Sequence, residues 1–128
     1  MEYRKNTKSK GFLGENEAVF YISQKGFTVL ERNLKEINGE VDIIAFKDEC
    51  FHFIEVKSSF RGEGSDNEGW FLEEKINSNK IKNINKVACL YLEKRGCENY
   101  SWCIDVISVL FSPKGEFLKI RMMDSVIL

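Results

Sequence analysis

Acidic residues lie within two β-rich runs of this chain, and their spacing could bind a divalent metal ion for phosphodiester hydrolysis. The runs cover residues 41–46 and 51–56 and flank a polar break at 47–49, a pattern typical of an antiparallel hairpin. A turn centred between the last two residues of the break places Asp42 directly opposite Glu55, with Cβ atoms roughly 4.5–5.5 Å apart. Two carboxylates at that spacing can share a hard cation such as Mg²⁺, whose ligands are oxygen atoms.

Lys57 is predicted to lie beside the two acids. Strand period two puts it on the face of Glu55, opposite Glu40. Its ammonium could orient the attacking water or stabilise charge on a phosphate. A turn with an odd number of residues would move Asp42 to the other face and separate the acids.

The structural alternative is an ordinary cross-strand ion pair between Glu40 and Lys57, with Asp42 and Glu55 merely solvated. The second acid in register favours the metal site over this alternative. The other face of the hairpin is almost wholly apolar and is expected to be core. Its residues are Val41, Ile43, Ala45, His52, Ile54 and Val56.

A helix is predicted over residues 10–25 from an apolar stripe that Glu15 interrupts. The inward residues are Phe12, Glu15, Ala18, Val19 and Ile22. Periodicity alone leaves two interpretations of Glu15 open. It either joins the cation of the hairpin acids or lies in water at the edge of the stripe.

Further strands and a second helix complete the pattern. Strands are predicted over residues 27–34, 102–111 and 117–123, and a helix over 78–95. Asp105, within the predicted strand 102–111, is expected to hydrogen-bond a neighbouring backbone or Arg32 rather than a metal. The order helix, three strands, helix, strand, strand predicts one α/β domain over residues 1–128.

Basic side chains could contact phosphate at several places. The second helix carries Lys80, Lys82 and Lys86 in a stretch without acids, which is either a nucleic-acid patch or a solvated face. Arg32 could contact phosphate or Glu15, or close a surface ion pair.

Composition bounds the class of protein. The 128 residues are 43% hydrophobic, enough for a core, and the net charge of −1 argues against binding by bulk charge. A basic tail is expected over residues 1–9 and a flexible acidic loop over 61–74. No apolar run of membrane-spanning length occurs, so a cytoplasmic protein is expected. The four cysteines have no Cys-x-x-Cys spacing, so buried reduced thiols are expected and a zinc site is not.

Several segments in combination resemble the PD-(D/E)xK nuclease superfamily. They are Leu13-Gly14-Glu15, Arg32-Asn33, Gly39-Glu40-Val41-Asp42-Ile43-Ile44, Phe53-Ile54-Glu55-Val56-Lys57, Lys80 and Ile104-Asp105-Val106. More closely, the chain is similar to the YraN-like family of small bacterial proteins, which are related to archaeal Holliday-junction resolvases.

The resemblance implies a restriction-endonuclease-like αβββαβ core with a mixed central sheet flanked by helices. It implies that Asp42, Glu55 and Glu15 are metal ligands and that Lys57 is the catalytic lysine. The family usually has a basic residue shortly after that lysine, and this chain departs from the pattern because Ser58 and Ser59 intervene before Arg61.

The expected function is therefore a Mg²⁺- or Mn²⁺-dependent endonuclease acting on DNA rather than RNA, including branched DNA in repair or recombination. Because resolvases act as dimers on two-fold junctions, a homodimer is expected by analogy. The alternatives are a non-catalytic nucleic-acid-binding module that keeps the fold and a protein-interaction adaptor.

Overall fold

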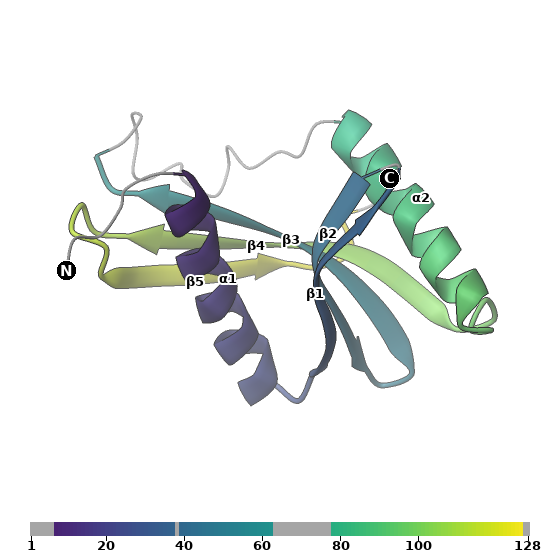
Figure 1. The fold of residues 1–128 in the computed structure, drawn as a ribbon. Coiled ribbons are helices and arrows are strands. Elements are labelled where there is room, and N and C mark those ends of the chain that lie inside the picture. The colour runs from purple at the N-terminus through teal and green to yellow at the C-terminus, as the bar shows by residue number, and fades with distance from the viewer. Residues whose placement is uncertain (1–6, 38, 63–77, 127–128) are drawn as a thin grey trace.

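The fold is a mixed five-stranded sheet with two helices, seen in a computed structural model that describes residues 7–37, 39–62 and 78–126 (Figure 1). The elements are α1 Thr7–Gln24, β1 Thr28–Glu36, β2 Gly39–Lys47, β3 Cys50–Phe60, α2 Ser78–Lys94, β4 Ser101–Phe111 and β5 Phe117–Met123. The strands lie in the order β1-β2-β3-β4-β5, with β3 and β4 parallel and all other neighbours antiparallel. This arrangement confirms the predicted fold class and the predicted order of elements.

Helix α1 begins inside the predicted basic tail, so residues 7–9 of that tail are helical. The remainder of the tail and nearly all of the acidic loop predicted over 61–74 lie outside the described residues. Neither described helix is long and apolar enough to cross a membrane.

The turn between β2 and β3 has the two-residue length that the acid register requires. Lys47 pairs with Cys50, and both residues between them have left-handed backbone angles, φ 50° at Asp48 and 62° at Glu49. Positive φ at both central positions is characteristic of a type I′ turn, whose twist matches that of the strands. The ladder then runs from this turn to the pair Ile43 and Ile54, and this confirms the predicted register.

The two helices cover opposite faces of the sheet. Residues of the first core cluster lie under α2, and residues of the second lie under α1. The first contains Val41, Ile44, Phe51, Phe53, Ile84, Val87, Ala88, Tyr91, Leu92 and Ile104. The second contains Ala18, Ile22, Ile43, Ala45, Ile54, Ile107, Val109 and Phe111. The alternation along β3 divides its side chains between the clusters, as period two requires.

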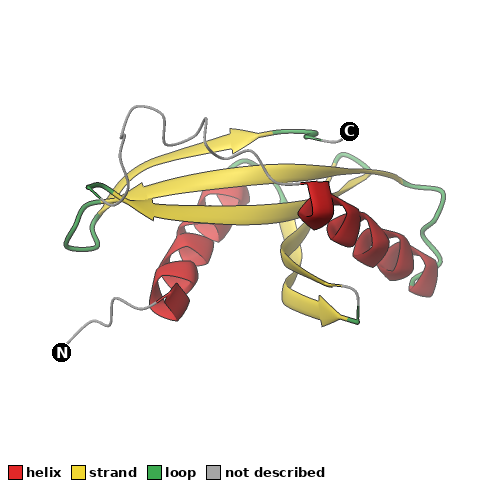
Figure 2. Cartoon of the chain, turned by 90° about the horizontal axis from the view of Figure 1, so that it is seen from above, coloured by secondary structure: helices red, strands yellow, loops and turns green. Residues whose placement is uncertain are grey.

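Val41 is an exception to the predicted faces. It was expected beside Ile43, but it packs in the α2 cluster with Leu34, its partner on β1. The reason is that the pairing of β2 with β3 ends at Ile43. Beyond that residue, the β1–β2 end turns away from the long strands β3 and β4 (Figure 2). Simple alternation therefore does not carry across this point.

Phe12 is a second exception, since it was expected to face inward but is 60% exposed. Small residues define the buried stripe of α1 instead: Gly14 and Ala18 lie at i and i+4, followed by Ile22. Phe12 is two residues, or roughly 200° of helix rotation, away from Gly14. It therefore points away from the sheet.

Gly14 is the point of closest approach between α1 and β3. A Cβ atom at this position would lie 1.8 Å from Ser58 Oγ, 3.1 Å from Ser58 Cβ and 3.6 Å from Val56 Cγ1. A side chain here would displace the Ser58 hydroxyl and press on Ser58 Cβ, so the position favours glycine. Because Glu15 follows directly, this contact also sets how near Glu15 comes to the hairpin.

Gly14→Ala should lower the free energy of unfolding by about 1–3 kcal/mol, because the added methyl overpacks the contact with Ser58. Gly11→Ala is the matched control in the same helix, where a Cβ would meet nothing within 4 Å. It should stabilise by roughly 0.5–1 kcal/mol through helix propensity. Urea denaturation of both variants measures the difference, and equal effects would contradict the close approach.

Candidate functional site

The acidic residues meet where β2 leaves β3. The backbone ladder ends at Ile43 and Ile54, and the next contact is made by a side chain, since Val56 N–H donates to Asp42 Oδ2 at 2.8 Å. Asp42 thus spans the gap that the departing strand opens. Its carboxylate is held against β3 in a partly buried position.

Asp42 and Glu55 form an acid pair. Glu55 is only 5% exposed. Burial, and then the charge of Glu55, raise the pKa of Asp42 from 3.8 to about 6. The hydrogen bond from Val56 and the charge of Lys80 oppose this rise without cancelling it. The pair therefore carries negative charge that the surrounding side chains do not fully balance.

Lys80 supplies positive charge to this pair from the first turn of α2. Its Nζ lies 3.0 Å from Glu55 Oε2. Burial alone would lower the pKa of Lys80, but the charge and hydrogen bond of Glu55, together with the charges of Asp42 and Glu40, raise it. Lys80 was predicted as part of a nucleic-acid patch or a solvated face, and in the structure its ammonium contacts Glu55 of the acid pair.

Glu15 approaches Asp42 from α1. Its Oε1 accepts a hydrogen bond from Asn33 Nδ2 at 3.0 Å and lies 3.7 Å from Arg32 Nη2. Burial is the largest cause of the raised pKa of Glu15, and the charge of Asp42 adds to it against the opposing effects of Asn33 and Arg32. Glu15 therefore lies partly buried beside Asn33 and Arg32, close enough to Asp42 to feel its charge.

Asn33 also lies at this site, although no role was predicted for it. It has a positive φ of 53°, which Asn tolerates better than most residues, and this conformation accompanies its contact with Glu15. Its place beside Arg32 in the family-like segment was the available signal.

Lys57 follows Glu55 by two residues on β3, so alternation directs both side chains to the α2 side. The alternative ion pair between Glu40 and Lys57 does not form, because Glu40 Oε1 lies 3.9 Å from Lys35 Nζ on the neighbouring strand. Within the described part of the chain, Lys57 has no ion pair. Its ammonium is thus available to a ligand at the acid pair.

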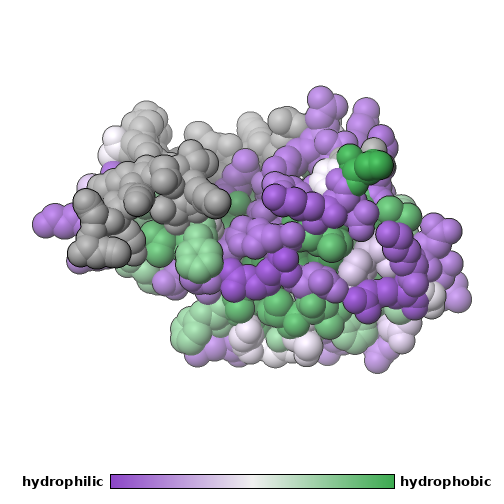
Figure 3. All heavy atoms as spheres, viewed as in Figure 1, coloured by the Kyte–Doolittle hydropathy of each residue, from purple (hydrophilic) through white to green (hydrophobic). Residues whose placement is uncertain are grey.

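The remaining predicted basic residues lie further out. Arg32 Nη2 donates to Asn16 Oδ1 at 2.9 Å, so Arg32 is held against α1. Arg61 is exposed, and its backbone N–H donates to Phe111 O at 2.7 Å. Lys82 and Lys86 are exposed on α2, where hydrophilic side chains gather in the view of Figure 3.

The donor set of the acid pair suits a hard divalent cation in kind. Asp42 and Glu55 offer carboxylate oxygens from two strands, and such ions need only one or two carboxylates besides water and substrate oxygens. The three predicted acids are not packed around one point, however. Across the described ranges, the only group of three or more ligating side chains with atoms all within 4.8 Å is Cys50, His52 and Cys103.

That group corrects the expectation about the cysteines. Cys50 and Cys103 are half-buried beside His52, and Cys89 is exposed rather than buried. Asp105 behaves as predicted in accepting a backbone N–H, from Ser125 at 2.8 Å. Its other oxygen contacts His52, not Arg32.

Asp42→Asn should stabilise the folded chain above neutral pH and have little effect in acid. Because the folded-state pKa of about 6 lies above the ordinary 3.8, the contribution of Asp42 is fully present below 3.8 and is lost as pH rises through about 6. The loss is up to about 3 kcal/mol, and asparagine mimics the protonated acid while keeping an acceptor for Val56.

Urea denaturation at about pH 8 and about pH 4 tests this, because the two conditions bracket the titration. Asp124→Asn, in an exposed position, is the control and should be neutral at both. Equal effects of Asp42→Asn at the two pH values would show that Asp42 is not strained by its neighbours.

Comparison with known proteins identifies relatives of this chain. The model of the uncharacterised protein family UPF0102 matches residues 14–109. A UPF0102 protein of Clostridium perfringens (strain 13 / Type A) is 37% identical over 108 residues, which cover 84% of each chain. A UPF0102 protein of Dictyoglomus turgidum is 36% identical over 113 residues, or 88% of this chain and 92% of that protein. Another, of Campylobacter fetus subsp. fetus, is 40% identical over 100 residues, or 77% and 81%.

The matched range includes Glu15, the acid pair, Lys57 and Lys80. The family resemblance drawn from the sequence is thereby confirmed. The chain belongs to the uncharacterised protein family UPF0102, the YraN family.

Proposed function

We propose that this protein is a Mg²⁺- or Mn²⁺-dependent endonuclease-like phosphodiesterase acting on DNA. The observation that carries the proposal is the acid pair, in which burial and then the charge of Glu55 raise the pKa of Asp42 to about 6. Perturbed acids next to a lysine are typical of catalytic sites.

The residues divide the work by position. Asp42 and Glu55 would hold the cation, and Glu15, tied to Asn33, would add negative charge behind them. A bound divalent ion lowers the pKa of its water and polarises a phosphate oxygen. Lys57, unpaired among the described residues and on the side of Glu55, would orient that water or stabilise the charge that builds up on the phosphate.

Lys80 keeps the acids together while no metal is bound. Its contact with Glu55 at 3.0 Å supplies one positive charge, which lowers the cost of holding two carboxylates beside each other. A divalent ion would supply two. Lys80 can then swing from the acid pair to a phosphate, since its side chain is flexible and its ammonium is a compact donor.

The choice of DNA, and of branched DNA in particular, rests on the resemblance to Holliday-junction resolvases. A homodimer would suit a two-fold junction, and it stays a prediction on the same ground. The cytoplasm, and a role in repair or recombination, are proposed as the setting for such a substrate.

Purified protein should nick four-way-junction or single-stranded DNA with Mg²⁺ or Mn²⁺, and EDTA should abolish the activity. Asp42→Asn and Lys57→Ala should each lower the cleavage rate at least about 100-fold, because Asp42 would hold the cation and Lys57 would stabilise the charge on the phosphate. Asp124→Asn and Lys119→Ala are matched controls in exposed positions and should cleave normally. Cleavage at the wild-type rate by both site variants would refute the proposal.

A second function, a non-catalytic nucleic-acid-binding module, is favoured by a specific observation. Lys80 already contacts Glu55, and the three predicted acids are not gathered within 4.8 Å as the described residues stand. On this hypothesis, the exposed face of α2 with Lys82 and Lys86 binds the phosphate backbone without a metal. Binding that persists in EDTA, with no cleavage of any DNA or RNA, would distinguish this function.

For either function, the double variant Lys82→Ala/Lys86→Ala should weaken DNA binding and make it less salt-dependent. The slope of log K against log salt should fall by about 2, because each phosphate-contacting lysine contributes roughly 1. Lys94→Ala/Lys114→Ala is a control of equal charge change. Fluorescence anisotropy over a salt series gives both slopes, and an unchanged slope in the double variant would place the DNA elsewhere.

A further inference from the structure

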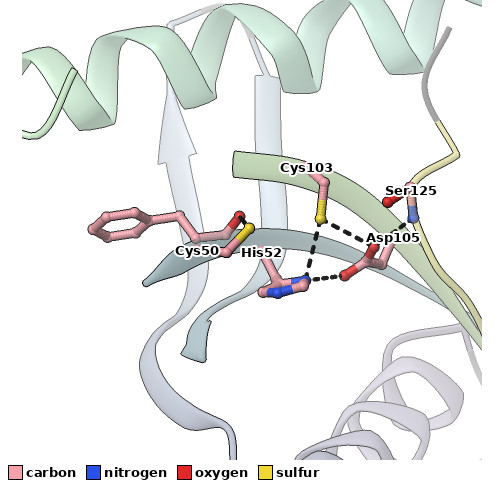
Figure 4. A network of polar contacts seen from close by, with 6 residues as sticks. Cys50, His52, Cys103, Asp105 and Ser125 are labelled. Carbon is pink, nitrogen blue, oxygen red and sulfur yellow. Dashed lines mark hydrogen bonds and ion pairs between the residues drawn. The ribbon is translucent and has the colours of Figure 1, made fainter. Parts of the chain in front are cut away.

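A second group of metal-ligating side chains lies on the other face of the sheet from Glu55. Cys50 and His52 of β3 and Cys103 of β4 each offer one ligand atom, and these atoms all lie within 4.8 Å of one another (Figure 4). All three side chains are half-buried, so an ion could reach them from solvent. The group shares no residue with the acid pair.

The parallel pairing of β3 and β4 brings these residues together. His52 pairs directly with Cys103, and Cys50 lies two residues earlier on the same face of β3. Asp105 lies two residues after Cys103, so its side chain joins the same face. The arrangement therefore depends on the central sheet and not on a loop.

The contacts of Asp105 indicate that this group of side chains is organised as a metal site. It is fully buried, and its Oδ2 lies 2.6 Å from His52 Nδ1, while its Oδ1 accepts the Ser125 N–H at 2.8 Å. A carboxylate on one ring nitrogen fixes the orientation of an imidazole and leaves the other nitrogen for a ligand. Histidines that bind metals in proteins are almost always held in this way.

Cys103 is fixed by the same network. Its Sγ lies 3.2 Å from His52 Nδ1 and donates to Asp105 Oδ1 at 3.4 Å. The side chain of His52 is also positioned by an edge contact with Phe27, whose ring centroid is 4.9 Å away. Asp105 thus holds both side chains, and the Cys103 thiol lies beside the same ring nitrogen, Nδ1, that Asp105 contacts.

A disulfide between Cys50 and Cys103 does not explain the group. The two residues are offset by two positions in the parallel ladder, which puts their Cα atoms roughly 8 Å apart. A disulfide requires less than about 7 Å.

We propose that Cys50, His52 and Cys103 form a binding site for Zn²⁺. Sulfur and imidazole donors select zinc over the hard ions that carboxylates prefer. Three protein donors leave a fourth position for water. Each thiol that coordinates the ion releases its proton to solvent. The bound ion would join the first residues of β3 and β4 and, through Asp105, the segment that contains Ser125.

The test is titration of Zn²⁺ and Co²⁺ into the full chain after reduction and treatment with EDTA. Wild type should bind one Zn²⁺ per chain, and Co²⁺ should give a near-ultraviolet sulfur-to-cobalt charge-transfer band that Zn²⁺ displaces. Cys50→Ser and Cys103→Ser should weaken binding at least about 100-fold, because losing even an outer partner of a ligand costs roughly 10–100-fold. Cys89→Ser is the matched control, since Cys89 is exposed on α2, and should bind like wild type.

The cobalt band of wild type decides the question even where a variant fails to fold. A folded wild-type chain that binds no Zn²⁺, or binds Co²⁺ without the thiolate band, would overturn the proposal. Equal loss of binding in Cys50→Ser and Cys89→Ser, with circular dichroism showing both folded, would also overturn it. Asp42→Asn should leave the band intact, which separates this site from the acid pair.

Discussion

The hydrogen bond from Val56 N–H to Asp42 Oδ2 governs the geometry of the acid pair. A regular ladder would have satisfied Val56 with a backbone carbonyl and kept β2 beside β3. The side chain of Asp42 takes that role at 2.8 Å, so the strands separate without leaving a buried donor unpaired. The separation in turn gives both helices access to one place, Glu15 from α1 and Lys80 from α2.

The negative charge of the acid pair is only partly neutralised by neighbouring side chains. A cationic ligand could neutralise the remainder. Burial and Glu55 raise the pKa of Asp42, whereas Glu55 itself has a lysine at 3.0 Å. One ammonium thus serves two carboxylates, with Glu15 near and Glu40 occupied by Lys35. A cation of higher charge would relieve more repulsion than Lys80 does, and this difference would drive binding despite the loss of water around the ion.

Much of this fold could be predicted from the sequence, because the patterns that determine it involve residues close together in the chain. The even turn at Asp48 and Glu49 and the alternation of the two runs determine the hairpin register, and the structure has that register. The predictions that were wrong involve packing between distant elements. Phe12 was placed inward because apolar residues dominate a periodicity count, yet Gly14 and Ala18 form the face of α1 that touches β3. The predicted face of Val41 was wrong because the sequence does not show where β2 leaves β3.

For the same reason, the acid pair could be predicted from the sequence, whereas the contacts between distant elements could not. The acid pair was visible in the sequence because it arises from one hairpin. The salt bridge of Lys80 with Glu55 joins residues on different elements, and no local pattern announces it. Cys50, His52 and Cys103 lack any metal-binding spacing along the chain. Only the parallel pairing of β3 with β4 makes them neighbours.

The alternation of side chains along β3 places the two sites on opposite faces of the sheet. Cys50 and His52 point to the α1 side, whereas Glu55 and Lys57 follow at an odd offset and point to the α2 side. Sulfur and imidazole therefore lie on one face, and carboxylate oxygens lie on the other. Because soft and hard donors select different ions, Zn²⁺ at the first group would not compete with Mg²⁺ at the second.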